Sequence, residues 1–150
     1  MNTELIWPTN ALNNFLIRKL NMSKRNKIIY WIATVWLSLG MVSTGIVQFT
    51  QAEAEVQKTC LHLGYPTYFL TIIGIWKILG VVAVLIPRYP ILKEWAYAGF
   101  FFLMSGAICS HLVKHDAAIE YFGPSLLLVL TITSWYFRPS DRTLLAFNNK

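Results

Sequence analysis

Lys77 is the residue whose type and position point most directly to chemistry. It lies in the apolar run from Thr67 to Ile86, near the middle of a segment long enough to cross a bilayer. A lysine at the bilayer centre costs about 2.5–3.5 kcal/mol on insertion, so it is expected to face the bundle interior or a wet cavity. We therefore expect Lys77 to bind an anionic or carbonyl group of a ligand. The alternative is a structural role, either bonded to backbone carbonyls and hydroxyls or uncharged.

A second polar group is expected near one membrane surface. Ser110 and His111 end the third apolar segment at a depth that matches Gln48 in the first segment, and Ser43 and Thr44 lie about one turn deeper. If these faces converge, they form a polar funnel that leads from the surface towards Lys77. Histidine exchanges protons near neutral pH, so His111 is a candidate for proton transfer or ligand contact. A histidine at a helix end is also stable at the interface without any further role.

The cysteines and histidines indicate no metal site. Cys60 and Cys109 form no C-x-x-C pair, and no second ligand has a diagnostic spacing from His111. Both cysteines are predicted on the same side of the membrane, where a disulfide between them would be permitted in a bacterium. The alternative is a buried, unreactive Cys109. His62 and His115 are expected to be solvated loop residues.

Four apolar segments must position these residues. The chain has 150 residues, of which 55% are hydrophobic, and the excess over soluble domains is concentrated in long runs. Each run approaches the length of about 20 residues that a helix needs to cross the hydrocarbon. The sequence therefore predicts an all-α integral membrane four-helix bundle, with helices over roughly residues 28–50, 67–86, 95–113 and 121–137.

The bundle is expected to form one domain over residues 24–139. Residues 1–23 would form either a tail or a short amphipathic helix on the membrane surface, and Met22 could be the true start. Residues 140–150 would form a C-terminal tail. The first apolar run exceeds the roughly 7–15 residues of a cleaved signal peptide, so a retained anchor is expected.

Basic residues predict how the bundle is oriented. The segment before the first helix, the "PRYP" connection and the segment after the last helix carry most of the lysines and arginines, whereas Lys58 and Lys114 alone lie in the other two connections. By the positive-inside rule, both termini face the cytoplasm. The net charge of +6 is then explained by orientation and anionic lipid. No nucleic-acid partner is expected, because the basic residues form no patch interleaved with aromatic ones.

Small residues predict how the helices pack. The third segment carries a row of residues at steps of three and four, which would let helix backbones approach closely in lipid: Ala96, Gly99, Leu103, Gly106 and Ser110. The second segment adds Gly74 and Gly80, and the first adds Gly40, Ser43 and Gly45. Glu94 is expected to begin this helix and to cap its free N–H groups. Aromatic residues at the segment ends fit interfacial belts: Tyr30, Trp31, Trp95, Tyr97, Trp135 and Tyr136.

Several short stretches resemble the DoxX-like family. They are "LGYP" at residues 63–66, "KILG" at 77–80, "LKEWAYAGF" at 92–100, and "SH" at 110–111 with Asp116 five residues beyond that histidine. The resemblance covers roughly residues 24–139 and implies a four-helix protein of the bacterial cytoplasmic (inner) membrane, with multiple passes. The broader family takes its name from a membrane subunit tied to quinone-linked sulfur oxidation, and other relatives are associated with redox and oxidative-stress complexes. The motif positions with an expected structural role are Gly64, Tyr65, Pro66, Gly80, Glu94, Trp95, Tyr97 and Gly99.

The chain departs from the family pattern at Leu103, where many relatives carry an aspartate in the third helix. Leu103 should lie near the depth of Lys77, so that aspartate would be a natural counter-ion. Its absence leaves Lys77 without an obvious carboxylate partner. This favours a bound ligand, a shell of hydroxyls and carbonyls, or a neutral amine.

The leading functional hypothesis is a redox-associated membrane protein that binds a quinone-like or other lipophilic ligand between its helices, with Lys77 on the ligand carbonyl. One alternative is a non-catalytic accessory or scaffold subunit of a membrane complex, and another is a small solute or ion transporter. The expected partners are the lipid bilayer and a membrane redox protein or a second copy of the chain. The sequence has no recognisable electron carrier, so the chain is not expected to be an enzyme on its own.

Overall fold

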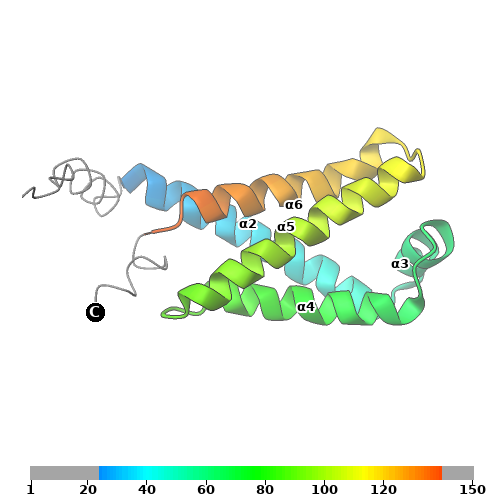
Figure 1. Cartoon of the computed structure of the whole chain (residues 1–150), viewed down its shortest axis with the longest axis horizontal. Coiled ribbons are helices and arrows are strands. Elements are labelled where there is room, and N and C mark those ends of the chain that lie inside the picture. The colour runs from blue at the N-terminus through cyan, green and yellow to red at the C-terminus, as the bar shows by residue number, and fades with distance from the viewer. Residues whose placement is uncertain (1–23, 140–150) are drawn as a thin grey trace, which may run out of the picture.

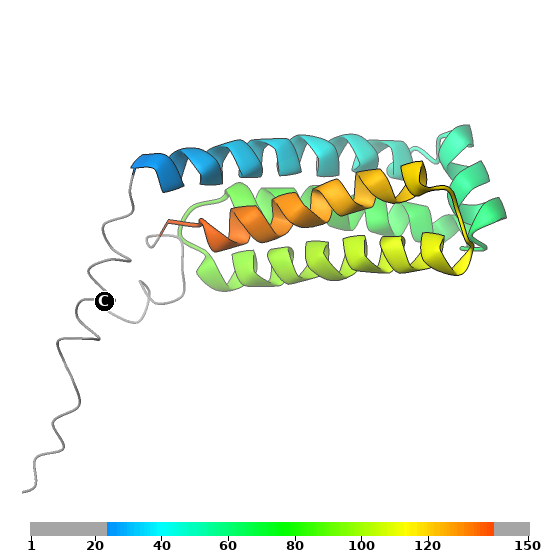
Figure 2. The ribbon, with the colours of Figure 1, turned by 90° about the horizontal axis from the view of Figure 1, so that it is seen from above.

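The computed structural model describes residues 24–139 and consists of four long helices that run up and down side by side (Figures 1 and 2). Within the described range there is no strand, and all four helices are long and apolar enough to cross a membrane. The predicted all-α four-helix architecture is confirmed. The helices are α2 (Lys24–Phe49), α4 (Thr67–Leu85), α5 (Pro90–Val113) and α6 (Ala118–Tyr136).

The ends of the bundle differ in character. The connections from α2 to α4 and from α5 to α6 lie at one end, and residues 24 and 139 lie at the other (Figure 1). We call the second the termini end. Which end faces the cytoplasm stays a prediction from the basic residues. Residues 1–23 and 140–150 lie outside the described residues, so the N-terminal segment, the start at Met22 and the C-terminal tail also stay predictions.

The segment between α2 and α4, which the sequence predicts as a long loop, is mostly helical. Its two turns, α3 (Glu53–Glu55) and the π-helical η1 (Val56–His62), cover one end of the bundle, which we call the capped end (Figure 1). Gly64 then takes a φ of 90°, a conformation that side chains with a Cβ rarely adopt. Pro66 follows in an extended conformation directly before α4. The "LGYP" motif therefore reverses the chain from the cap into the membrane.

Helix α5 begins at Pro90, about one turn before the predicted start near Trp95. Proline suits the first position of a helix because its φ is already helical and it has no N–H to leave unpaired. The early start places Lys93 on the helix, where it is buried and its Nζ donates to the carbonyl oxygens of Ala83, at 3.4 Å, and Val84. Those carbonyls belong to the last turn of α4, so Lys93 satisfies groups that a helix end leaves free.

The predicted capping role of Glu94 is wrong for the same reason, because Glu94 lies in the second turn of α5. Its carboxylate instead forms an ion pair with Arg138 and accepts a hydrogen bond of 2.8 Å from Nε1 of Trp135. Glu94 thus ties α5 to the end of α6.

The core lies between mid-membrane and the termini end. Its apolar part consists of Leu37, Met41, Val81, Val84, Tyr97, Phe100 and Met104. Next to it, Ser134 on α6 bonds to Oγ1 of Thr34 at 2.7 Å and to the hydroxyl of Tyr97 at 2.8 Å. These bonds join three helices, and such bonds are retained in lipid because no water competes for them.

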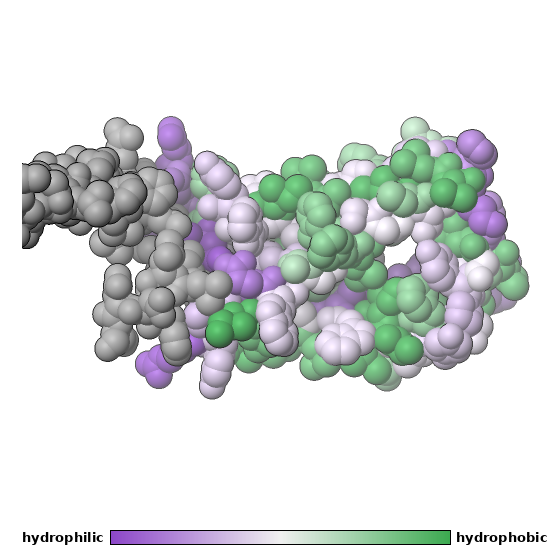
Figure 3. Space-filling view, viewed as in Figure 1, coloured by the Kyte–Doolittle hydropathy of each residue, from purple (hydrophilic) through white to green (hydrophobic). Residues whose placement is uncertain are grey.

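Two of the six aromatic residues expected at the membrane interface are buried instead. Tyr30 and Tyr97 are fully buried, so their predicted place in an aromatic belt is wrong. The other four expected members, Trp31, Trp95, Trp135 and Tyr136, are exposed. Large apolar side chains also cover the outer surface of the helices (Figure 3), as expected for a surface in contact with lipid.

The predicted close packing of helices is confirmed between α2 and α4, at Gly45 and Gly74, and is wrong for the third helix. A Cβ added to Gly74 would lie 2.6 Å from the carbonyl oxygen of Gly45 and 2.7 Å from the backbone nitrogen of Phe49. By contrast, a Cβ added to Gly99 or Gly106 of α5 would have no atom within 4 Å. The small residues of α5 therefore leave open space instead of allowing a close backbone contact.

This difference predicts opposite outcomes for two glycine substitutions. Gly74→Ala should lower the midpoint of thermal unfolding in detergent, because overpacking of a fixed backbone contact costs about 1–3 kcal/mol. Gly99→Ala should leave the midpoint unchanged or raise it, since alanine has the higher helix propensity by up to about 1 kcal/mol. Equal midpoints for the two variants would contradict the helix contact described here.

Candidate functional site

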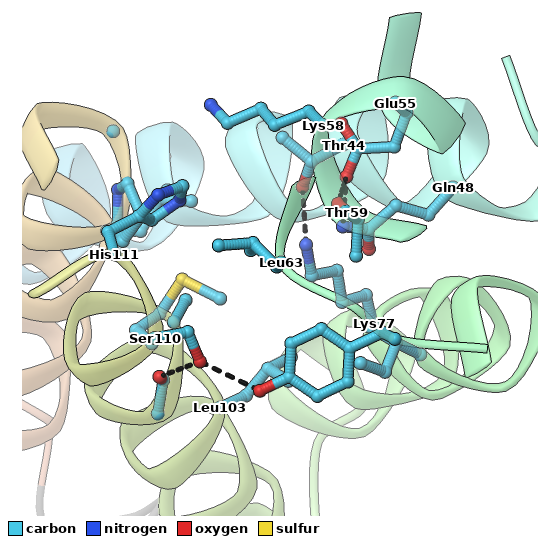
Figure 4. Close-up of a pocket in the computed structure, with 18 of the residues that line it drawn as sticks. Thr44, Gln48, Glu55, Lys58, Thr59, Leu63, Lys77, Leu103, Ser110 and His111 are labelled. Carbon is cyan, nitrogen blue, oxygen red and sulfur yellow. Dashed lines mark hydrogen bonds between the residues drawn. The ribbon is translucent and has the colours of Figure 1, made fainter. Parts of the chain in front are cut away.

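A cavity of about 540 Å³ lies inside the capped end of the bundle, beneath α3 and η1. Polar side chains from the long helices line it: Thr44 and Gln48 from α2, Lys77 from α4, and Ser110 and His111 from α5 (Figure 4). The cap adds Glu55 from α3 and Lys58 and Thr59 from η1. Ser43 also lines it, from an exposed position on α2. The structure thus brings together all five predicted ligand-binding residues, Lys77, Ser110, His111, Gln48 and Ser43, around one space.

Lys77 lies in the floor of this cavity and is buried, with 4% of its surface exposed. Its side chain points towards Thr44 (Figure 4). Its Nζ donates one hydrogen bond of 3.1 Å, to Oγ1 of Thr44. A lysine ammonium has three N–H donors. Thr44 uses one of them, which leaves two available to the cavity.

Glu55 is the acidic group whose charge acts on Lys77. Its Oε1 accepts hydrogen bonds from Nε2 of Gln48 at 2.8 Å and from Oγ1 of Thr59 at 3.2 Å. Sequence reasoning missed Glu55, whereas it placed Thr44 beside Ser43 in the expected polar funnel. Glu55 lies in a segment that the sequence predicts as loop, and its position over Lys77 depends on how that segment folds back.

Ser110 and Tyr65 join the cap to α5 along the wall of the cavity (Figure 4). The Ser110 hydroxyl donates to the carbonyl oxygen of Gly106 at 2.9 Å, so it accepts the hydrogen bond of 2.8 Å from the Tyr65 hydroxyl. The Tyr65 ring also stacks on Phe69 with centroids 4.8 Å apart. Ser110 therefore has a structural bond at this wall, as well as a place in the cavity lining.

Two histidines meet one carboxylate at the outer rim of the cavity. Nδ1 of His111 lies 2.6 Å from Oδ2 of Asp116, and Nε2 of His62 lies 2.6 Å from Oδ1 of the same residue. The hydroxyl of Tyr121 donates to the backbone oxygen of Asp116 and holds this loop against α6. His62 is thus bonded, whereas the sequence predicts a solvated loop residue. His115, the other predicted loop histidine, is exposed.

These bonds lower the pKa of the Asp116 carboxyl below its usual range. The main cause is the hydrogen bond from His111, followed by the one from His62, with a smaller contribution from the charges of the two rings. Asp116 is therefore a carboxylate at neutral pH and accepts a hydrogen bond from each ring. A second contact between η1 and the segment that contains Asp116 and α6 is the ion pair of Lys58 with Glu120.

A second hollow, a groove of about 680 Å³, runs along the outside of the bundle between α4 and α5. The two helices are joined closely at the termini end and diverge towards the capped end (Figure 1). Gly99 leaves space in the groove wall, and Phe100 packs on Gly80. The groove lining is almost entirely apolar, and Lys77 and Leu103 line both the groove and the cavity. Figure 3 shows this face hollowed, with hydrophilic residues visible inside it.

The sequence profile of the DoxX-like family matches residues 32–134, from the middle of α2 to the end of α6. The chain belongs to the DoxX-like family. No curated protein and no solved structure matches it.

Leu103 of this DoxX-like protein, where the resemblance to the family implies an aspartate, lies with Lys77 at the junction of the cavity and the groove. The acidic group near the lysine comes instead from the cap, as Glu55. The charge that acts on Lys77 is therefore placed on the polar side of the ammonium, away from the apolar groove.

The two cysteines of the DoxX-like protein are free thiols in this structure, so the disulfide that the sequence permits is not formed here. Cys60 is half-buried in η1, and Cys109 is exposed on α5, which makes the predicted burial of Cys109 wrong. Within residues 24–139, no three His, Cys, Asp or Glu side chains are arranged to hold a metal ion.

The lowered pKa of Asp116 predicts how the stability of the capped end depends on pH. A carboxyl with a lowered pKa in the folded protein stabilises it above the ordinary value of 3.8, and this contribution is lost as pH falls through the lowered pKa. Asp116→Asn should therefore lower the unfolding midpoint at pH 5–7, and its difference from the wild type should shrink below a pH of about 4. Thermal scans in detergent across this range measure the difference.

The matched control is Glu53→Gln, which removes an exposed carboxylate from the neighbouring turn α3. It should change the midpoint little at any pH. If Asp116→Asn and Glu53→Gln gave the same profile, the histidine contacts would not be responsible for the stability of this end.

Proposed function

We propose that this DoxX-like protein binds a quinone-like or other lipophilic molecule between its helices. The polar head would occupy the cavity beneath the cap, and the apolar chain would lie in the groove between α4 and α5. The observation that carries the proposal is the position of Lys77, a buried ammonium at the junction of a polar cavity and an apolar groove. Each part of the site suits one part of such an amphiphile.

The head group would be one that accepts hydrogen bonds. A charged or polar group at mid-membrane is costly unless it is paired, and Lys77 has two N–H donors beyond the bond to Thr44. A carbonyl or anionic oxygen in the cavity would accept from them. Glu55 balances the charge of the lysine while its carboxylate is hydrogen-bonded to Gln48 and Thr59, which leaves the ammonium accessible to a ligand.

The chain of the ligand would be hydrocarbon or isoprenoid. Ligand sites are usually clefts of about 300–1,000 Å³ lined by apolar and aromatic residues, and the groove falls within this range. Exposed aromatic residues such as Trp76 and Trp95 border it, so it opens towards the surrounding lipid. Entry would be lateral, from the bilayer, because the ties from η1 to Asp116 and Glu120 cover the capped end.

Any reduction of the ligand would need a partner that supplies electrons, and any oxidation would need a partner that accepts them. The proposed role is therefore to hold a lipophilic redox molecule for a membrane partner, which unites the ligand-binding hypothesis with the accessory-subunit hypothesis. Transport gains no comparable support, because the apolar core that includes Met41 and Phe100 fills the bundle between the cavity and the termini end.

The test is to purify the protein in mild detergent and to identify co-purifying molecules by solvent extraction and mass spectrometry. Lys77→Leu removes the ammonium, and Gly106→Phe fills the cavity at a position where an added Cβ meets no atom. Both variants should lose at least about ten-fold of the bound lipid, equivalent to about 1.4 kcal/mol of binding free energy. Cys109→Ala, on the exposed face of α5, is the matched control and should retain it.

Gly99→Phe separates the two halves of the site, because it fills the groove while the cavity stays open. It should reduce retention of long-chain ligands more than that of short-chain analogues added during purification. If the wild type retained no specific lipophilic molecule, or if Lys77→Leu and Gly106→Phe retained as much as the control, the proposed function would be wrong.

A further inference from the structure

We propose that His62, Asp116 and His111 form a proton path between the water at the capped end and the head group of the ligand in the cavity. This inference rests on the proposed function and narrows the class of ligand. The ligand would carry an ionisable hydroxyl, as a hydroquinone or another phenol does, and this hydroxyl would donate to Nε2 of His111.

The first support is the gradient of exposure along the three residues. The His111 side chain is 5% exposed and lines the cavity, the Asp116 side chain is 9% exposed, and the His62 side chain is 52% exposed. Both nitrogen–oxygen distances between neighbours are 2.6 Å, within hydrogen-bond range. All three residues also line a small pocket on the outer surface. The chain of hydrogen bonds therefore leads from the buried cavity to water.

The second support is the tautomer that Asp116 imposes on His111. An ionised carboxylate only accepts hydrogen bonds, so Nδ1 of His111 carries the proton in the contact with Asp116. In the neutral ring, Nε2 then has a free lone pair. A hydroxyl in the cavity can donate to that lone pair, whereas a carbonyl cannot.

The proton balance of the path is simple. The ligand O–H gives its proton to Nε2 of His111, and the proton on Nδ1 passes to Asp116. For this step His62, whose side chain is 52% exposed, carries its own proton on Nδ1, so that its bare Nε2 takes the proton from Asp116 while Nδ1 releases one to water. His111 is then protonated on Nε2 and returns to its starting form when its ring exchanges that proton for one on Nδ1. The net step moves one proton from the ligand to water and leaves a ligand oxyanion. Lys77, across the same cavity, is the cation that would stabilise this anion.

The other charged and titratable groups around the path bond to other partners and not to the Asp116 carboxylate. Lys58 of η1 and Glu120 of α6 line the same outer pocket and form an ion pair with each other. Tyr121 of α6 bonds to the backbone of Asp116, and Tyr65 bonds to Ser110 on α5. His111 and His62 are thus the titratable side chains in contact with the Asp116 carboxylate among the described residues.

The first experiment tests the tautomer by nitrogen-15 NMR of the full chain labelled at histidine and embedded in lipid nanodiscs. The sequence has three histidines, so His62→Asn and His115→Asn assign the spectrum. The His111 ring should carry its proton on Nδ1 at neutral pH, and Asp116→Asn should change this state. A His111 ring protonated on Nε2 in the wild type would overturn the proposal.

The second experiment follows proton exchange with a probe, an alkyl-substituted nitrophenol whose phenolate absorbs visible light. Binding is measured first, and Gly106→Phe should abolish it. After a rapid pH jump, deprotonation of the bound probe should be at least ten-fold slower in Asp116→Asn and in His62→Asn than in the wild type, at similar probe affinity. His115→Asn, an exposed neighbour outside the path, is the matched control and should respond as the wild type does.

The outcomes separate the two proposals. If Gly106→Phe and Lys77→Leu abolish probe binding while Asp116→Asn and His62→Asn respond at the wild-type rate, the proton path is wrong and the binding site stands. If the wild type does not bind the probe, or if Gly106→Phe binds it equally well, both proposals are wrong.

Discussion

The burial of one ammonium at mid-membrane is the constraint on which the rest of this structure depends. Lys77 cannot pack against lipid, so the helices around it must leave a polar hollow on one side. Thr44 supplies one acceptor and Glu55 supplies the balancing charge from the cap. The cap in turn needs its own ties to α5 and α6, which the Tyr65–Ser110 and His62–Asp116 bonds provide. The architecture of the capped end follows from the placement of this one charge.

The two halves of the bundle differ in how tightly their helices pack. Towards the termini end, the apolar core, the Thr34–Ser134–Tyr97 bonds and the Glu94–Arg138 ion pair join all four helices. Towards the capped end, α4 and α5 diverge, and glycines on α5 leave open volume. A rigid half therefore supports an open half. This is a common arrangement for sites that must admit a ligand without loss of the fold.

The sequence predicts the four spans, the depth of Lys77 and the convergence of five polar residues, because helix length and helix period follow from local patterns. It does not predict Glu55, which reaches Lys77 only after residues 53–62 fold into a cap. Nor does it distinguish Gly74, which packs tightly, from the glycines of α5, which leave space, since a row of small residues looks the same in either role. Tyr97 shows the same limit, because a tyrosine near a segment end suits the interface equally well. Contacts between distant segments decide these cases.

The bond of Lys93 to the last carbonyls of α4 has a mechanical consequence. It fixes α5 to α4 beside the short connection at residues 86–89, so this point can act only as a pivot. A helix of 24 residues extends about 36 Å, and a rotation of about 5° at the pivot displaces its far end by about 3 Å. A small change in the angle between α4 and α5 at the termini end therefore produces a larger change in the width of the groove towards the capped end.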